Sequence, residues 1–370
     1  FGLTHRWGDL LQDAQHALQK YWQKNGVEHA RKDPYCDGYC FWTIADCAVY
    51  SEKFGAYTAQ GLFNPFWGTK RCGSSPEDFA VFNSPTCVLL DTENLTRDLA
   101  GSKRVAKNWN IPGSPEETNR VYQVGETIPV EFRFVHFGER PVADAELQWS
   151  FVAPDGRVLA SETFGVGTQV VGPVRSLGRR RIAVPAVARP TKVRFEVAVR
   201  TKDRSFEQAN AWDFWFFPAA DDMPVPENVV VAGWGTPAAE AAYASGKNVL
   251  TLANQTGKPN FILGWWNIGT QVGMAAVEHP VLGDFPFEPY LCPLLFRIVH
   301  EGTKLPLAGF TEKDLVIVGE GLKEAYAYLA VRDLPNGRKH VFVSGLDLGS
   351  RTVEGCALRR AILKYLGGSK

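Results

Sequence analysis

Residues 38–46 read Gly38-Tyr-Cys-Phe-Trp-Thr-Ile-Ala-Asp46, and residues 60–67 read Gln60-Gly-Leu-Phe-Asn-Pro-Phe-Trp67. The first run predicts a strand over 39–45 that is apolar on both faces, as parallel strands covered by helices are. Aromatic rings can cover the apolar faces of a sugar ring, and short polar side chains can bond its hydroxyls. We therefore expect a carbohydrate site, whose substrate-binding side chains are Trp42, Asp46, Gln60, Asn64 and Trp67.

The composition is that of a globular chain without a large net charge. At 370 residues we expect two or three domains. Lys+Arg and Asp+Glu are 40 each, so we expect neither a nucleic-acid partner nor an anionic membrane surface. No apolar run approaches the roughly 18 residues of a membrane helix. Seven cysteines without a C-x-x-C pair indicate reduced thiols, and we expect no metal site and no cofactor.

The first segment, 1–105, contains too few elements for a core of its own. Apolar residues recur at helical spacing from Trp7 to Trp22, which predicts a helix over 7–24 that ends near Gly26. Pro76-Glu-Asp78 begins a short helix, and Thr86 to Leu90 predicts a strand. One helix and one strand cannot make a core. We therefore expect this segment to be the last βα portion of a barrel or sheet whose other strands are absent.

A polar linker over 101–119 leads to a strand-rich segment, 118–218. Short strands without helices predict an immunoglobulin-like β-sandwich, with strands at 127–134, 145–151, 181–184, 192–199 and 211–217. The basic run from Arg175 to Arg194 lies inside it. We interpret this run as a solvated sheet face or a contact with another domain.

After a second linker, Pro218 to Pro226, strands and helices alternate over 226–370. The pattern predicts strands at 229–233, 249–252 and 315–318, a hairpin of 325–331 with 339–345, and helices at 237–245 and 354–366. This is a small doubly wound α/β domain of flavodoxin or amidotransferase type, expected to be noncatalytic. The predicted fold class is thus a multidomain α/β plus β chain.

The first hundred residues resemble a known family. Gly38-Tyr-Cys-Phe-Trp-Thr-Ile-Ala-Asp46, with Gln60-Gly-Leu62 and Lys70, is similar to the eighth barrel strand and following loop of glycoside hydrolase family 2. The resemblance implies that Trp42 packs against the sugar at the cleavage point. It also implies that residues 1–105 are the C-terminal end of a TIM barrel. The chain would then be the C-terminal portion of a retaining β-glycosidase similar to β-galactosidases.

The resemblance places the two catalytic carboxylates on barrel strands four and seven, upstream of Phe1. Family members often carry Glu-Tyr-Gly or Glu-Phe-Gly at the nucleophile, and this chain begins Phe1-Gly2, so we expect that Glu directly before Phe1. Family β-glucuronidases use an Asn-x-Lys pair, which the spacing of Asn64 and Lys70 does not match. The resemblance therefore favours a neutral sugar such as galactose.

Two alternatives from other classes stay open. One is a noncatalytic carbohydrate-binding or structural module with Trp42, Trp67, Trp265 and Trp266 as platforms. The other is a separate hydrolase in 226–370 that uses Cys292 or Cys356. Cys292 has no glycine beside it, and Cys356 lies in a helix pattern, so neither resembles a nucleophile on a sharp turn. The expected partners are the carbohydrate, the missing N-terminal barrel portion and, through the added domains, an oligomer. A periplasmic or secreted bacterial location is the working expectation.

Overall fold

The computed structural model describes residues 5–33, 35–40, 44–46, 61–92, 120–219, 223–253, 273–299, 304–320, 325–348 and 352–368. They belong to two compact units. Unit 1 comprises Phe1–Gln19, Ala45–Gly73 and Ala220–Lys370, and unit 2 comprises Lys20–Ile44 and Ser74–Ala219. The predicted domain boundaries at 105, 118, 218 and 226 stay predictions.

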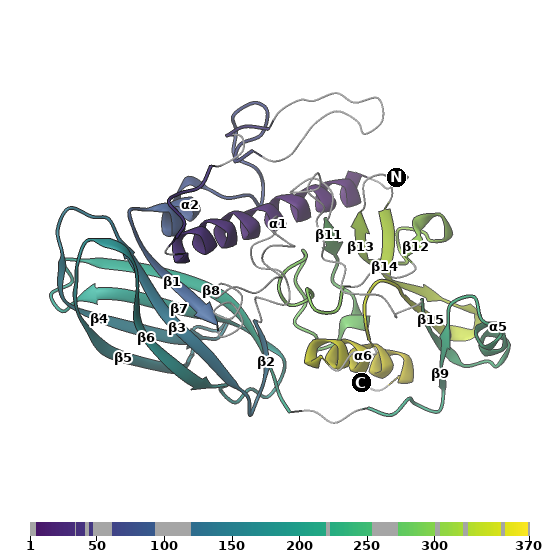
Figure 1. The fold of residues 1–370 in the computed structure, drawn as a ribbon. Coiled ribbons are helices and arrows are strands. Elements are labelled where there is room, and N and C mark those ends of the chain that lie inside the picture. The colour runs from purple at the N-terminus through teal and green to yellow at the C-terminus, as the bar shows by residue number, and fades with distance from the viewer. Residues whose placement is uncertain are drawn as a thin grey trace. The chain divides into compact units, whose positions relative to one another are not determined.

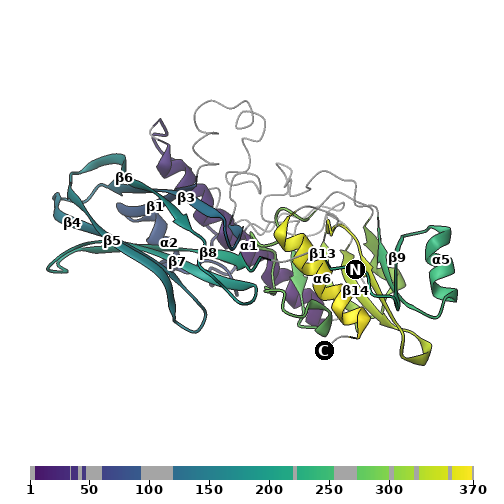
Figure 2. The ribbon, with the colours of Figure 1, turned by 90° about the horizontal axis from the view of Figure 1, so that it is seen from below.

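Unit 2 is built on two β-sheets (Figures 1 and 2). The first sheet has the order β1-β3-β6, with β1 at Thr86–Thr92, β3 at Thr127–His136 and β6 at Gly172–Ala183. The second sheet has the order β2-β8-β7-β4-β5, with its strands at Val121–Gln123, Glu207–Phe217, Thr191–Thr201, Val142–Val152 and Val158–Gln169, respectively. Every pairing is antiparallel except that of β2 with β8.

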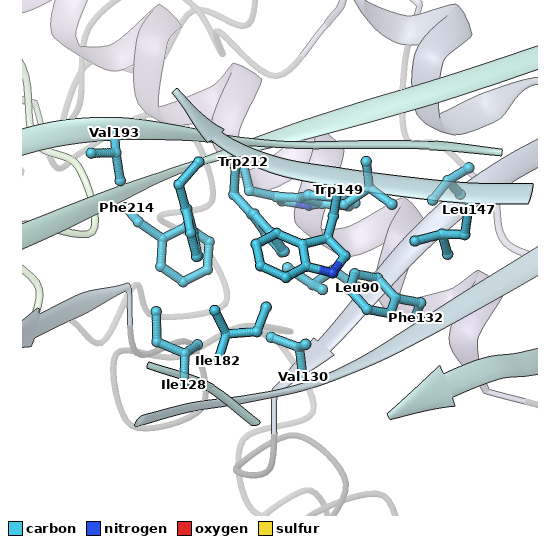
Figure 3. Packing of buried hydrophobic residues seen from close by; sticks show 14 of the residues in the cluster. Leu90, Ile128, Val130, Phe132, Leu147, Trp149, Ile182, Val193, Trp212 and Phe214 are labelled. Atoms are coloured by element: carbon cyan, nitrogen blue, oxygen red, sulfur yellow. The ribbon is translucent and has the colours of Figure 1, made fainter. Parts of the chain in front are cut away.

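The two sheets enclose one apolar core (Figure 3). Alternate residues of β4 point inward, so that Leu147, Trp149 and Phe151 are buried between half-buried neighbours. In Figure 3 Leu147 and Trp149 lie opposite Val130 and Phe132 of the other sheet. This packing confirms a β-sandwich.

The predicted strands of the sandwich are confirmed, but β5 and most of β6 were missed. Their side chains are largely exposed or half-buried and rich in Gly, Ser and Arg, so they lack the apolar alternation that marks a strand. Arg180 of β6 pairs with Glu162 of β5 at 3.0 Å and lies 3.8 Å from the Phe164 ring centroid. This part of the basic run therefore lies on a sheet face with cross-strand pairs, in agreement with the interpretation as a solvated sheet face.

Helix α1 spans His5–Lys32, eight residues beyond its predicted end at 24. The prediction that Gly26 ends the helix is wrong, because the helix continues through Gly26 into Val27 and Glu28, which are both buried. Nothing in the packing requires a glycine there, since a Cβ at Gly26 would meet nothing within 4 Å. Tertiary packing overrides the low helix propensity of glycine. Helix α2, Pro76–Asn83, begins as predicted, with a capping box formed by Ser75 and Asp78.

Glu28 is buried in unit 2 and makes three polar contacts. Its carboxylate accepts hydrogen bonds from Asn210 Nδ2 at 2.8 Å and Trp212 Nε1 at 3.0 Å, and it pairs with Lys24 at 3.0 Å. Burial by itself would raise the pKa of Glu28. Lys24, Lys32 and the two hydrogen bonds outweigh burial and hold that pKa below its usual value.

Unit 1 contains a mixed sheet of order β11-β13-β14-β15-β10-β9, with β12 paired to β14. The strands are Met274–Ala276, Leu315–Glu320, Ala325–Asp333, Lys339–Val343, Asn248–Leu252 and Val229–Gly233 in that order, with β12 at Leu305–Pro306. Helices α5, Pro237–Ala244, and α6, Val353–Gly367, pack against this sheet. Short 3-10 turns lie at Pro280–Leu282, Leu307–Gly309 and Pro335–Gly337.

The individual elements predicted for 226–370 are confirmed, but no flavodoxin-like domain is evident among the described residues. Only β9, β10 and β15 run parallel, while β14, β13 and β11 continue the sheet antiparallel. No TIM barrel is evident in the described part of the chain either. Of the predicted strand 39–45, residues 41–43 lie outside the described part, and the four described residues form no strand. Ala45 makes one isolated bridge, to Phe63, and Tyr39 and Ile44 are exposed, so the expectation of a strand buried on both faces is wrong for them. The supported fold class is a β-rich chain with mixed sheets. Among the described helices none is long and apolar enough to cross a membrane.

His340 of β15 is buried with 1% of its surface exposed. Its Nε2 lies 2.6 Å from Thr251 Oγ1 and 3.1 Å from Tyr243 Oη. Burial first, and then the charge of Arg332, lower its pKa from 6.5 to about 3. The imidazole is therefore neutral at pH 7, and Nε2 lies within hydrogen-bond distance of both hydroxyls.

We predict that Glu28→Ala lowers the free energy of unfolding of unit 2 by about 3–5 kcal/mol, because it leaves Lys24 and two polar groups without their buried partner. Glu196→Ala, on the exposed side of β7, should change it by less than about 0.5 kcal/mol. Urea unfolding followed by tryptophan fluorescence measures both values. Equal effects of the two substitutions would contradict the structural role of Glu28.

We also predict an acid-sensitive contribution from His340. Its folded pKa lies below its unfolded value, so the unfolded state binds the proton first and stability is lost as pH falls through 6.5 toward 3. Between pH 7 and pH 5 this costs about 2 kcal/mol. His340→Gln does not titrate, so urea unfolding of the variant should lack that share of the pH dependence. If the free energy of unfolding of His340→Gln falls with pH as steeply as that of the unaltered chain, His340 does not make this contribution.

Candidate functional site

A buried ion pair lies at the base of the loop that follows the aromatic motif. Lys70 Nζ lies 2.8 Å from Asp46 Oδ1, and these two side chains are 1% and 2% exposed. The same ammonium donates to the Gly61 carbonyl at 2.6 Å and to Gln19 Oε1 at 3.1 Å. Burial lowers the pKa of Lys70, and the bond to Asp46 opposes that effect.

Gly61 allows the loop to close onto this ion pair. Its N–H donates to Asp46 Oδ1 at 2.7 Å. A Cβ at Gly61 would lie 2.3 Å from the Ala45 carbonyl carbon and 2.4 Å from the Asp46 nitrogen, so no other residue fits. The predicted site residue Asp46 is thus engaged twice by its own loop, and this geometry makes it a positioning residue for residues 61–70.

Asn64 organises the tip of the loop, residues 64–68. Its Oδ1 accepts hydrogen bonds from the N–H groups of Phe66 and Gly68, both at 2.9 Å. Its backbone N–H donates to the Gly68 carbonyl and its carbonyl accepts from the Trp67 N–H, again at 2.9 Å. These four bonds form a closed turn of the kind that asparagine favours.

The turn displays two aromatic rings to solvent. Phe66 is 91% exposed and Trp67 is 67% exposed. Trp67 has a φ of 64°, a conformation that bulky residues rarely adopt and that costs about 1–3 kcal/mol. Its ring stacks beside Phe63 at a centroid distance of 6.3 Å. An exposed ring held at such a cost is a feature that usually serves binding.

Beside the turn lies a polar pocket of about 300 Å³, formed entirely within unit 1. Helix α1 lines one side with side chains spaced at i, i+3, i+4 and i+7, namely Asp9, Gln12, Asp13 and His16. The other lining residues are Asp46, Asn64, Pro65, Thr69, Lys70 and Arg71. The pocket therefore joins two of the predicted site residues, Asp46 and Asn64, to a helix face that sequence reasoning had not assigned.

Asp13 and Arg71 fix the helix to the loop. Arg71 Nε lies 2.6 Å from Asp13 Oδ1, and Tyr290 Oη donates to Asp13 Oδ2 at 3.3 Å. Burial, the contact with Cys72 and the charge of Asp13 raise the pKa of Tyr290, so its phenol stays protonated as a donor. Both cations of the pocket, Lys70 and Arg71, thus have a carboxylate partner.

His16 is 6% exposed and its Nδ1 lies 2.9 Å from the Arg71 carbonyl. Burial lowers its pKa and the charge of Lys70 lowers it further, against opposing effects of the Arg71 carbonyl, Asp46 and Asp13. The imidazole is neutral at pH 7. A carbonyl can only accept, so Nδ1 carries the proton and Nε2 is an acceptor.

Of the five predicted site residues, the structure brings Asp46 and Asn64 together in the pocket wall and places Trp67 in the adjoining turn at 64–68. Trp42 and Gln60 lie outside the described residues, as do Trp265 and Trp266. Sequence reasoning missed His16, Asp13 and Arg71. The polar stripe at 9, 12, 13 and 16 was an available signal, because that spacing places residues on one helix face. Among the described residues no cluster of three or more His, Cys, Asp or Glu could hold a metal ion.

One family model matches residues 126–218, within the sandwich, and its description is a domain of unknown function (DUF8488). No curated protein matches the sequence significantly.

Similar solved structures include two glycosidases. The exo-chitosanase of Amycolatopsis orientalis is 13% identical with a TM-score of 0.31, over 56% of this chain and 19% of that one. The β-glucuronidase of Parabacteroides merdae is 19% identical with a TM-score of 0.19, over 24% of this chain and 11% of that one.

An alkylpurine DNA glycosylase of Pseudomonas fluorescens is 16% identical with a TM-score of 0.21, over 27% of this chain and 28% of that one. The chain thus spans well under a third of each of these three proteins. Similarity at this level includes glycoside hydrolases, but it carries no argument about activity.

We predict opposite effects of one substitution at two glycines of unit 1. Gly61→Ala should destabilise the loop by more than about 1 kcal/mol, because the added methyl group clashes with backbone atoms. Gly8→Ala, inside α1 with nothing within 4 Å, should stabilise by up to about 1 kcal/mol. Hydrogen exchange of the Asn64 amide for the first variant and thermal unfolding for both measure this. A neutral Gly61→Ala would refute the close approach.

Proposed function

We propose that the chain is the C-terminal portion of a retaining β-glycosidase similar to family 2 enzymes, acting on a neutral β-glycoside. The observation that carries the proposal is the anchored loop 61–70, which follows the family-like motif and places Asn64 and Trp67 beside a polar pocket. The resemblance of residues 38–46 supplies the reaction class. The proposed fold of this segment is the end of a barrel.

In this proposal each side chain has a distinct task. Trp42 packs against the sugar ring at the cleavage point, Gln60 and Asn64 bond hydroxyls, and the exposed ring of Trp67 covers an apolar sugar face. Asp46 acts through the loop it positions. A retaining reaction needs an acid/base carboxyl group and a nucleophilic carboxylate about 5–5.5 Å apart. The proposal places both on barrel strands that precede Phe1, the nucleophile directly before it.

A noncatalytic carbohydrate-binding module is the second candidate. The rigid display of Phe66 and Trp67 favours it, because a binding module needs aromatic platforms but no catalytic carboxylates. The two candidates differ in turnover.

We predict that the longer protein, including the residues before Phe1, hydrolyses aryl β-glycosides of neutral sugars. Trp42→Ala should lower kcat/KM about 10- to 100-fold, the loss of one buried aromatic contact. Trp234→Ala, a half-exposed tryptophan of unit 1 away from the loop, should leave it unchanged. Replacing the glutamate that the proposal places directly before Phe1 by glutamine should abolish turnover, because the nucleophilic carboxylate is then lost. A folded protein that binds neutral glycosides but turns over none of them would support the binding module instead.

A further inference from the structure

His16 offers the pocket an acceptor that the protein itself does not use. Its Nδ1–H is engaged by the Arg71 carbonyl, and no partner of Nε2 is recorded among the described residues. The side chain is more than nine-tenths buried, yet it lines the pocket. Nε2 is accessible from the pocket, so a hydroxyl group of a ligand can donate a hydrogen bond to it.

The charges of the pocket select against an anionic ligand. Lys70 is paired with Asp46 and Arg71 with Asp13, and Asp9 adds a further carboxylate. A ligand carboxylate would have to compete with these buried partners and would face the charge of Asp9. A neutral ligand with hydroxyl groups meets acceptors on His16 and Asp13 and donors on Gln12 and Thr69.

The size of the pocket limits the ligand. Its volume of about 300 Å³ lies at the lower end of ligand pockets, which run from roughly 300 to 1,000 Å³. It suits a single sugar ring better than a chain of rings. The adjoining turn at 64–68 places Asn64 and Pro65 in the pocket wall.

We propose that this pocket binds one neutral sugar ring, with His16 Nε2 accepting a hydrogen bond from a sugar hydroxyl. The inference deepens the proposed function and rests on it for the carbohydrate class of the ligand. It adds a recognition residue on helix α1 and gives the specificity for neutral over uronic sugars a physical cause. Asp13 and Arg71 position the imidazole by holding helix and loop together.

The test uses two substitutions that separate the two nitrogens of His16. The amide of His16→Asn can replace Nδ1 and keep the bond to the Arg71 carbonyl, but it leaves nothing at Nε2. The longer His16→Gln can place an acceptor near Nε2 while giving up the bond to Arg71. His279→Asn is the matched control, because His279 Nδ1 accepts from the Val281 N–H outside the pocket and asparagine can cap in the same way.

Binding of methyl β-galactopyranoside, methyl β-glucopyranoside and methyl β-glucuronide to the full chain is measured by NMR titration at pH 7.5. We expect saturable binding of a neutral glycoside and weaker binding of the glucuronide. His16→Asn should weaken neutral-glycoside binding about tenfold with a native NMR spectrum, while His279→Asn and His16→Gln bind within about threefold of the unaltered chain.

Three results would overturn the inference. These are no saturable binding of either neutral glycoside, equal or tighter binding of the glucuronide, or unaltered binding by His16→Asn. Should His16→Asn fail to fold, His16→Phe with ligand-induced shifts of the Asn64 and Thr69 amides gives the same decision. Turnover by the longer protein is a separate readout. Binding without turnover keeps the pocket and removes the glycosidase, and turnover without pocket binding does the reverse.

Discussion

The ion pair of Asp46 and Lys70 is the constraint on which the candidate site depends. Two charges with 1–2% exposure are stable only with close partners, so the protein must hold Gly61, Gln19 and the loop around them in one arrangement. That arrangement determines where residues 61–70 approach Asp46 and therefore where the turn at 64–68 lies. Asp46, Lys70 and Asn64 all lie in the wall of the pocket.

Helix α1 applies the same rule along its length. In unit 1 its polar stripe ends in Asp13 and His16, which are buried and bonded to the loop. In unit 2 its Glu28 and Lys32 are buried and paired. Each of these groups costs free energy unless it is satisfied, so the polar contacts of this helix add to its buried apolar residues. The neutral imidazole of His16 keeps an acceptor that is accessible from the pocket.

The sequence predicted those parts of the fold that follow from local periodicity. Strands β3, β4, β7 and β8 alternate clearly, and the capping box at Ser75 marks α2. Strand β5 and the continuation of α1 past Gly26 were missed because tertiary packing, not local pattern, produces them. For the site, the aromatic motif led to Asp46, Asn64 and Trp67. Asp46 pairs with Lys70, 24 residues away in the sequence, and α1 packs beside residues 61–70. Such long-range contacts cannot be predicted from the local pattern of a single sequence.

The most direct measurement is a double-mutant cycle between Asp46→Asn and Lys70→Met, read as the opening free energy from hydrogen exchange of the Asn64 amide. This amide bonds to Gly68 and touches neither substituted side chain. If the pair anchors the loop, each single variant leaves a buried group unpaired, and the double variant loses about 1–3 kcal/mol less than the sum of the two. Effects that add within about 0.5 kcal/mol would contradict the account.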